Sequence, residues 1–449
     1  MSLDAAMLRA ALKPLESAEA AHAQRYPGDS TLRQPVHTVY GGAQLFRADT
    51  AVKLGQIARG ALEQFAPEPR DFEDALGLAA TAAADVHRRV RERLSQQPVE
   101  DFRIDFEDGY GNRPDDEEDG HARAAAVELA RGLAEGLLPP FTGVRIKPVS
   151  PELRARSIRT LDLFLGSLLE ASGGELPAGF VITLPKVTMP EQAAYFADVL
   201  DALEEQFGIA EGALRFEFMV ETPQIIVDAT GRCPLPLVVD AARGRAVAAH
   251  FGTYDYTAAC NITATEQRMR HPVCDHARHV MQVALAGTGI WLSDGSTAVL
   301  PVPPHRAAAD TVLTDAQQTE NRDTVHRAWR LHYDDVQDSL MRGLYQGWDL
   351  HPAQLVTRYA ALYDFFLRGL DAAGDRLHNF LERAAQATLL GEMFDDAATG
   401  QGLLNFFLRA INAGAVTEQE TLARTGLSHD ELRTRSFVRI LRGRTGASG

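Results

Sequence analysis

The sequence predicts an α/β fold, a (β/α)₈ barrel with a helix before it and an all-helical domain after it. Short apolar runs alternate with Ala- and Leu-rich segments of helical periodicity, and eight such runs occur. This alternation is typical of a parallel sheet, and eight strands are the number that closes a barrel. An open, doubly wound sheet is the alternative. The 449 residues accommodate a barrel of roughly 250 residues and additions at both ends.

The expected elements follow one another regularly along the chain. The first thirty residues predict one amphipathic helix that ends near the breaker at residues 27–29. The eight strands are expected within residues 35–42, 102–108, 142–148, 179–186, 214–221, 246–255, 289–295 and 345–352. Helical periodicity occupies residues 51–65, 74–94, 121–137, 151–169, 190–207, 272–286 and 319–344.

After residue 351 the strand patterns stop, and helical patterns cover residues 353–373, 377–390, 402–412 and 417–442. We therefore expect three parts. These are an N-terminal helical segment (1–30), a barrel domain that carries the catalytic site (31–355) and a C-terminal helical domain (356–449).

Composition argues against several classes of partner. The net charge of −16 provides no basic surplus for binding nucleic acid or an anionic membrane. The sequence contains no run of about 18 apolar residues, the length that a span of a bilayer requires. The N-terminus does not have the pattern of a secretory signal. Three cysteines are too few for a disulfide framework and suit a reducing compartment. We expect a cytoplasmic protein that binds neither nucleic acid nor membrane.

Charged side chains gather where the expected strands end, which is where a barrel places its active site. Burying so many charges would be costly unless they meet each other, a cation or a ligand. The residues are Asp105, Glu107 and Asp108 after the second run, Arg145 and Lys147 in the third, Lys186 after the fourth, Glu221 after the fifth and Asp255 after the sixth.

Glu221 and Asp255 follow adjacent strands, so their carboxylates can converge on one point. Mg²⁺ prefers oxygen ligands and commonly takes one or two carboxylates, with water and substrate oxygens completing its shell. Such an ion polarises a carbonyl and stabilises an enolate. The competing interpretation is a pair of helix N-caps, or carboxylates that form ion pairs near Arg145.

Several short motifs occur in a fixed order along residues 36–355. They are DFEDGYG (105–111), VRIKP (144–148), LPKV (184–187), VETP (220–223), HFGTYDY (250–256) and GLYQGWDLHPAQL (343–355). This ordered set resembles the HpcH/HpaI aldolase, citrate lyase β-subunit and malate synthase superfamily of TIM barrels, which form enolates with the help of a metal. The resemblance implies a homo-oligomeric enzyme.

The same resemblance implies roles for individual residues. Glu221 and Asp255 would bind Mg²⁺, or Mn²⁺ in its place. Arg145 would bind a carbonyl or carboxylate oxygen of the substrate. Glu107 and Asp108 would hold metal-bound waters or orient Arg145. We also expect Asp105 and Lys186 to take part in substrate binding. A Schiff base on Lys186 and a structural ion pair are the alternatives for that lysine.

A further motif lies in the C-terminal region. FDDAAT (394–399) resembles the malate synthase segment whose aspartate is the catalytic base. The resemblance implies that Asp396 removes a proton from the methyl group next to a thioester, which is work suited to a carboxylate. The sequence departs from the malate synthase pattern directly afterwards, and a helix N-cap is the competing interpretation of Asp396.

We therefore expect a Mg²⁺-dependent carbon–carbon lyase or synthase that acts through the enolate of a 2-oxo acid or an acyl-CoA, with small 2-oxo acids or aldehydes as partners. Asp396 favours Claisen chemistry on an acyl-CoA. The acidic run at 115–119, if it lies on the same rim, disfavours a polyphosphate handle and favours aldol chemistry on a free acid.

Two rival interpretations belong to other classes. One is a phosphotransfer enzyme that handles phosphoenolpyruvate or pyruvate, for which Arg145, Lys147 and Lys186 are the visible basic candidates. The other is a catalytically silent barrel that serves as a scaffold.

Overall fold

The computed structural model describes residues 5–30, 32–307, 311–382, 388–390, 393–395, 397–436, 439–440 and 443. Its centre is a closed barrel of eight parallel strands in sequence order, and pairing of the first strand with the eighth closes it. The strands are β1 (His37–Gly42), β2 (Asp101–Asp105), β3 (Phe141–Arg145), β4 (Phe180–Leu184), β5 (Phe216–Val220), β6 (Ala246–Phe251), β7 (Trp291–Ser296) and β8 (Gln346–Asp349). The predicted barrel is confirmed, and the open sheet is excluded.

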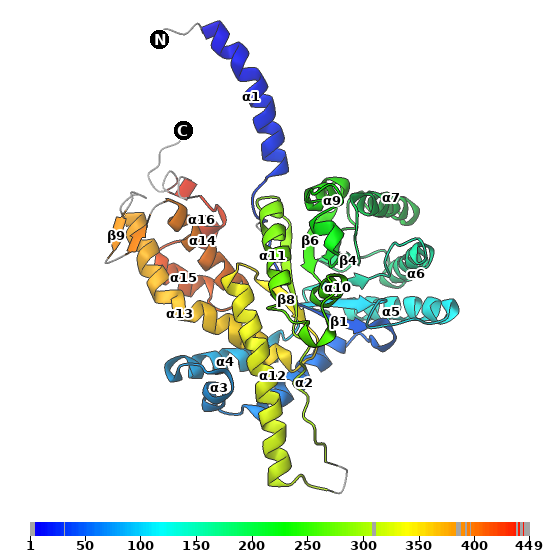
Figure 1. Ribbon diagram of the computed structural model, residues 1–449, viewed down its shortest axis with the longest axis vertical. Coiled ribbons are helices and arrows are strands. Elements are labelled where there is room, and N and C mark those ends of the chain that lie inside the picture. The colour runs from blue at the N-terminus through cyan, green and yellow to red at the C-terminus, as the bar shows by residue number, and fades with distance from the viewer. Residues whose placement is uncertain are drawn as a thin grey trace.

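Helices follow the strands and surround the barrel (Figure 1). The longer ones are α2 (Thr50–Phe65), α3 (Pro69–Leu76), α4 (Ala80–Gln96), α5 (Asp115–Glu135), α6 (Arg154–Ser172), α7 (Pro190–Phe207), α11 (Pro272–Leu285) and α12 (Asp315–Met341). The shorter ones are η1 (Ala43–Leu45), α8 (Pro223–Ile226), α9 (Leu235–Ala241), α10 (Thr253–Ala259) and η2 (Ala264–Glu266). No helix among the described residues is long and apolar enough to cross a membrane.

The barrel interior contains an ion pair between strands that are not neighbours. Arg103 of β2 donates hydrogen bonds of 2.9 and 2.8 Å to Glu217 of β5. These strands are not neighbours, so both side chains must face the interior. Phe102 and Ile104 alternate with Arg103 along β2 and are also buried, which the period of two along a strand explains.

The helical C-terminal region lies to one side of the barrel (Figure 1). It comprises α13 (Gln354–Glu382), the hairpin of β9 (Thr388–Leu390) and β10 (Met393–Asp395), α14 (Ala397–Asn412), α15 (Glu418–Thr425) and α16 (His429–Arg433). Helix α13 packs against α2, α4 and α12 as well as against α14 and α15. It therefore links the barrel helices to the tail.

Several predicted helix boundaries were wrong, including the start of the helix expected over 121–137, which begins at Asp115. The helix expected over 74–94 is split into α3 and α4 by Gly77, whose φ of +64° ends the first helix. The helix expected over 417–442 is split by Gly426 in the same conformation. The break expected near 373–377 does not occur, because Gly374 stays helical within α13, with Phe407 and Arg424 beside it. Residues 388–390, expected to be helical, form β9.

Helix α1 (Ala5–Arg25) confirms the N-terminal helix but contacts little else. It projects away from the body (Figure 1), and the described side chains from residue 12 to residue 25 are exposed. The apolar face expected from the sequence therefore packs on no other part of this chain that the structure describes.

Candidate active site

Arg145, the last residue of β3, is the centre of a charged cluster at the carboxyl ends of the strands. Its guanidinium donates hydrogen bonds of 2.7 and 2.6 Å to the two carboxylate oxygens of Asp105, the last residue of β2. Its Nη1 lies 2.9 Å from Oε2 of Glu107 and 3.5 Å from Oδ2 of Asp108. Arg145, Asp105 and Glu107 are buried, whereas the Asp108 side chain is 62% exposed. The structure thus brings these four predicted residues together.

The guanidinium of Arg145 also contacts two aromatic rings. The Arg145 carbon Cζ lies 4.7 Å from the ring centre of Tyr40 and 5.9 Å from that of Trp348. Contacts of this kind attract a cation to the ring face. Tyr40 was not among the predicted site residues. Its position near the end of the first apolar run was the available signal.

The turn after β2 is shaped around Asp105. Backbone N–H groups of Glu107 and Gly109 donate to its carboxylate at 3.0 and 2.7 Å. A side chain at Gly109 would place a Cβ 2.7 Å from Asp105 Oδ2, so glycine is required there. Burial alone would raise the pKa of Asp105, but the Arg145 guanidinium and these N–H groups lower it below its ordinary value.

Lys186 links Glu107 to two more carboxylates of the site, those of Glu221 and Asp255. Its Nζ lies 2.9 Å from Oε1 of Glu107 and 3.1 Å from Oδ2 of Asp255. Its backbone N–H donates to Oε1 of Glu221 at 2.6 Å. Lys186 also has a φ of +50°, an uncommon conformation for a residue other than glycine and one that often marks functional sites.

Glu221 is buried directly after β5. A Cβ at Gly252 would lie 2.6 Å from the Cβ and from one carboxylate oxygen of Glu221, which explains the glycine in HFGTYDY. Burial raises the pKa of Glu221 to about 8, opposed by Lys186 and reinforced by the carboxylates of Glu107 and Asp255. The positive charge of Lys186 therefore does not offset the effect of burial on this carboxylate.

The donor set fits a hard divalent cation. Among the residues that the structure describes, five carboxylates (Asp105, Glu107, Asp108, Glu221 and Asp255) are linked to two residues with cationic side chains, Arg145 and Lys186. No three His, Cys, Asp or Glu side chains in the described part of the chain are placed to hold a metal by themselves. Mg²⁺ commonly takes only one or two carboxylates from a protein, and Glu221 and Asp255 both contact Lys186.

Other predicted residues lie elsewhere. Lys147 is buried and donates at 2.8 Å to both Glu118 and the backbone oxygen of Phe106, so it is occupied structurally. The acidic run at 115–119 begins α5, and its Asp119 pairs with Arg156 and Arg159 of α6. Acidic side chains stabilise the N-terminal end of a helix. Asp396 lies outside the described residues.

The chain matches a family model described as a domain of unknown function, DUF6986, over residues 15–440. No curated protein matches it. Among solved structures, a citrate lyase from Burkholderia xenovorans LB400 superposes with a TM-score of 0.56 at 19% identity, over 88% of this chain and 96% of that one. At this identity the likeness shows the fold.

Two further solved structures give lower scores. A Haloferax volcanii malate synthase in a magnesium and glyoxylate complex has a TM-score of 0.45 at 16% identity, over 93% of this chain and 99% of that one. A citrate lyase beta subunit from M. tuberculosis, complexed with oxaloacetate and magnesium, has a TM-score of 0.36 at 18% identity, over 74% of this chain and 99% of that one.

Proposed function

This chain belongs to the DUF6986 family, and we propose that it is a magnesium-dependent carbon–carbon lyase or synthase that acts through the enolate of a 2-oxo acid or an acyl-CoA. One observation carries the proposal. Buried Arg145 and the carboxylates of Glu221 and Asp255 are joined through Lys186 and Glu107 at the carboxyl ends of the barrel strands. Active sites of (β/α)₈ barrels are built at that end.

Glu221 and Asp255 would hold the divalent cation. Bound there, Mg²⁺, or Mn²⁺ in its place, supplies Lewis acidity toward a carbonyl oxygen. The excess of carboxylates over cations at the site supports this assignment. Glu107 contacts both cations, so it can orient them or hold water near the ion.

Arg145 would bind the oxygen on which negative charge develops. Asp105 holds its Nε and Nη2 by hydrogen bonds, while Nη1 faces the carboxylates of Glu107 and Asp108. A guanidinium clamped in this way is oriented before substrate arrives and need not reorganise during the reaction. Preorganised donors of this kind are worth several kcal/mol in the transition state.

The arrangement disfavours two alternatives. A Schiff base requires a neutral amine, whereas the ammonium of Lys186 is held by Glu107 and Asp255. A phosphotransfer site requires several free cations, whereas Lys147 is bound to Glu118. Aldol and Claisen variants both fit the cluster, and the proposed role of Asp396 as the base of a Claisen reaction distinguishes them.

Calorimetry on metal-stripped protein tests the proposal. Mg²⁺ is titrated with and without pyruvate, glyoxylate, oxaloacetate and acetyl-CoA. We expect metal-dependent binding of a 2-oxo acid, weakened at least about tenfold in Asp255→Asn and in Glu221→Gln, since each removes a ligand. Asp162→Asn changes a carboxylate on the exposed side of α6 and should bind like the wild type.

Two outcomes distinguish the Claisen reaction and the scaffold from the other interpretations. Acetyl-CoA turnover that disappears in Asp396→Asn, with 2-oxo acid binding retained, selects the Claisen reaction. If wild type and Asp255→Asn give the same heats with every compound, the enzyme proposal fails and the scaffold interpretation takes its place.

A further inference from the structure

A cavity of about 1030 Å³ lies at the opposite end of the barrel from the candidate active site. The first residues of six strands line it, and these are Asp101, Phe141, Phe180, Ala246, Trp291 and Gln346. We propose that this N-terminal cavity binds an amphipathic anion, a molecule with an apolar chain or ring and one carboxylate. The proposal is independent of the chemistry at the other end of the barrel.

One wall of the cavity is a strap, residues 26–30 and 32–36, which connects α1 to β1. The strap is fastened to the barrel at both ends. Gly28 N–H donates to the oxygen of Gly287 at 2.9 Å. The side chain of Gln34 donates to Leu292 O at 3.1 Å and to Gln346 Oε1 at 3.0 Å. This wall of the cavity is therefore held in place by hydrogen bonds to the barrel.

The tail fastens the same strap. Arg409 of α14 donates to Oε1 of Gln34 at 2.7 Å, and Asn412 donates to its backbone oxygen at 2.6 Å. Arg435 forms an ion pair with Asp29 at 2.7 Å. Three side chains of the C-terminal region thus keep the strap in place over the end of the barrel.

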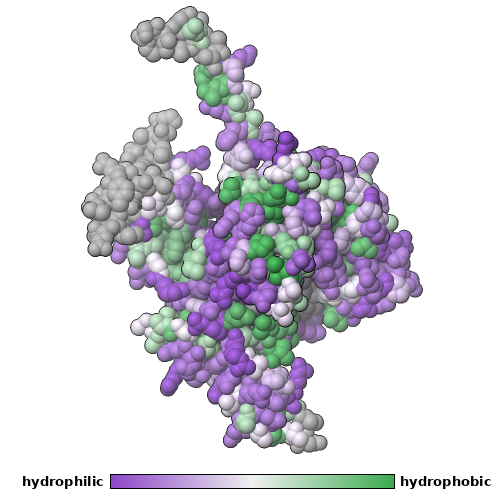
Figure 2. All heavy atoms as spheres, in the orientation of Figure 1, coloured by the Kyte–Doolittle hydropathy of each residue, from purple (hydrophilic) through white to green (hydrophobic). Residues whose placement is uncertain are grey.

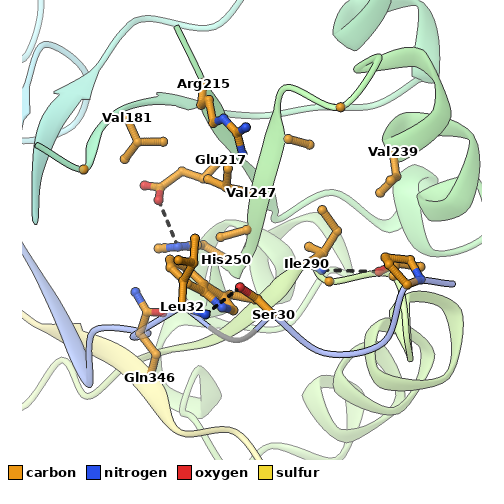
Figure 3. Close-up of a pocket in the computed structure, with 18 of the residues that line it drawn as sticks. Ser30, Leu32, Val181, Arg215, Glu217, Val239, Val247, His250, Ile290 and Gln346 are labelled. Carbon is orange, nitrogen blue, oxygen red and sulfur yellow. Dashed lines mark hydrogen bonds and ion pairs between the residues drawn. The ribbon is translucent and has the colours of Figure 1, made fainter. Parts of the chain in front are cut away.

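Apolar side chains from several elements face the cavity (Figure 3). Val181 of β4, Val247 of β6, Ile290 before β7, Val239 of α9 and Leu32 of the strap all line it. A volume of about 1030 Å³ is far larger than the voids that packed interiors tolerate, and it matches that of small-molecule sites. Hydrophobic atoms also gather at the surface near α11 and α9 (Figure 2), the two helices that supply Ala284 and Val239 to the lining.

The inner end of the cavity presents an unpaired polar group. His250 is fully buried, and its Nε2 lies 3.2 Å from Oε2 of Glu217 (Figure 3). Its Nδ1 has no hydrogen-bond partner among the residues that the structure describes. Buried polar atoms are nearly always paired, so an orphaned one indicates a bound ligand or water. Glu217 also accepts hydrogen bonds from Arg103 and Thr183, so Nδ1 is the atom of the imidazole that is left for a ligand.

The charged side chains that line the cavity favour an anionic ligand. Five arginines and three carboxylates line the cavity, in a chain whose net charge is −16. Four of these arginines form ion pairs with carboxylates. The fifth, Arg215, is exposed, and no ion pair joins it to a carboxylate of the described residues. It precedes β5 and lies beside Glu217 in Figure 3. A free guanidinium binds a carboxylate well, and it repels a cation.

Decanoate, kept well below its micellar concentration, is the probe. Calorimetry with metal-free protein should show one site with a dissociation constant below about 1 mM. Decyltrimethylammonium has the same chain with the opposite charge and should bind at least tenfold more weakly. Arg215→Gln should weaken decanoate binding at least tenfold, whereas Arg154→Gln, which removes an exposed arginine outside the cavity, should leave it unchanged.

Substitution of a lining residue by the larger tryptophan tests whether decanoate binds in the cavity. Val247→Trp should abolish decanoate binding, and Val239→Trp on α9 serves the same purpose if the first variant does not fold by circular dichroism. Asp255→Asn should bind decanoate like the wild type. The proposal is overturned if the wild type does not bind decanoate, if both amphiphiles bind equally, if Arg215→Gln has no effect, or if binding survives a folded cavity-filling variant.

Discussion

Protonation of His37 should destabilise the fold as the pH falls from 6.5 to 4. His37 is the first residue of β1 and is fully buried. Its Nε2 accepts a hydrogen bond of 3.0 Å from the backbone N–H of Glu100, and its Nδ1 lies 3.3 Å from Oδ2 of Asp349. Because Nε2 acts as an acceptor, the imidazole is neutral in the native state.

The magnitude follows from the pKa. Burial lowers the pKa of His37 from 6.5 to about 4, against the opposing effect of Asp349 and Glu100. The unfolded chain therefore binds a proton below pH 6.5, while the folded chain does so only near pH 4. This contribution to stability is fully present above pH 6.5 and is lost as the pH falls to 4. At 1.36 kcal/mol per pH unit, the loss is about 3.4 kcal/mol.

Urea unfolding at a series of pH values measures this loss. The free energy of unfolding of wild type should fall by about 3 kcal/mol more than that of His37→Gln between pH 7 and pH 4. Carboxylates that titrate in this range affect both proteins and cancel in the difference. His22→Gln, at an exposed position of α1, should follow the wild type. Parallel profiles for wild type and His37→Gln would refute the reasoning.

Three further substitutions test the barrel and its charged cluster. Asp105→Asn removes the carboxylate that neutralises buried Arg145 and should lower the free energy of unfolding by about 3–5 kcal/mol in urea; an unchanged midpoint would contradict this. Arg145→Lys keeps the charge but loses the two-point hydrogen bonding, so kcat on whichever 2-oxo acid binds should fall ~10²-fold while the melting temperature changes little. Gly143→Ala would place a Cβ 1.9 Å from the backbone oxygen of Val181 and should cost at least about 3 kcal/mol of stability, or prevent soluble expression; a stable variant would show that β3 and β4 can separate.

Local patterns determined much of this protein. The alternation of apolar runs and helical segments predicted the eight strands and the order of the barrel, because strand and helix periodicities involve neighbouring residues only. Position at the strand ends also placed Arg145, Lys186 and Glu221 at one rim, since parallel strands end at the same edge of a sheet. The boundaries at Gly77 and Gly426 were missed, because a helix pattern continues across a glycine that ends it.

Only the tertiary structure decided which charges meet. Lys147 and Arg145 lie two residues apart in one motif, yet one binds Glu118 of α5 and the other Asp105. The rings of Tyr40 and Trp348 come together over Arg145 from opposite ends of the barrel sequence. The cavity at the other end of the barrel likewise depends on packing between the strap and seven strands, and side chains of the tail contact the strap. Such contacts join residues far apart in the chain, and local periodicity does not record them.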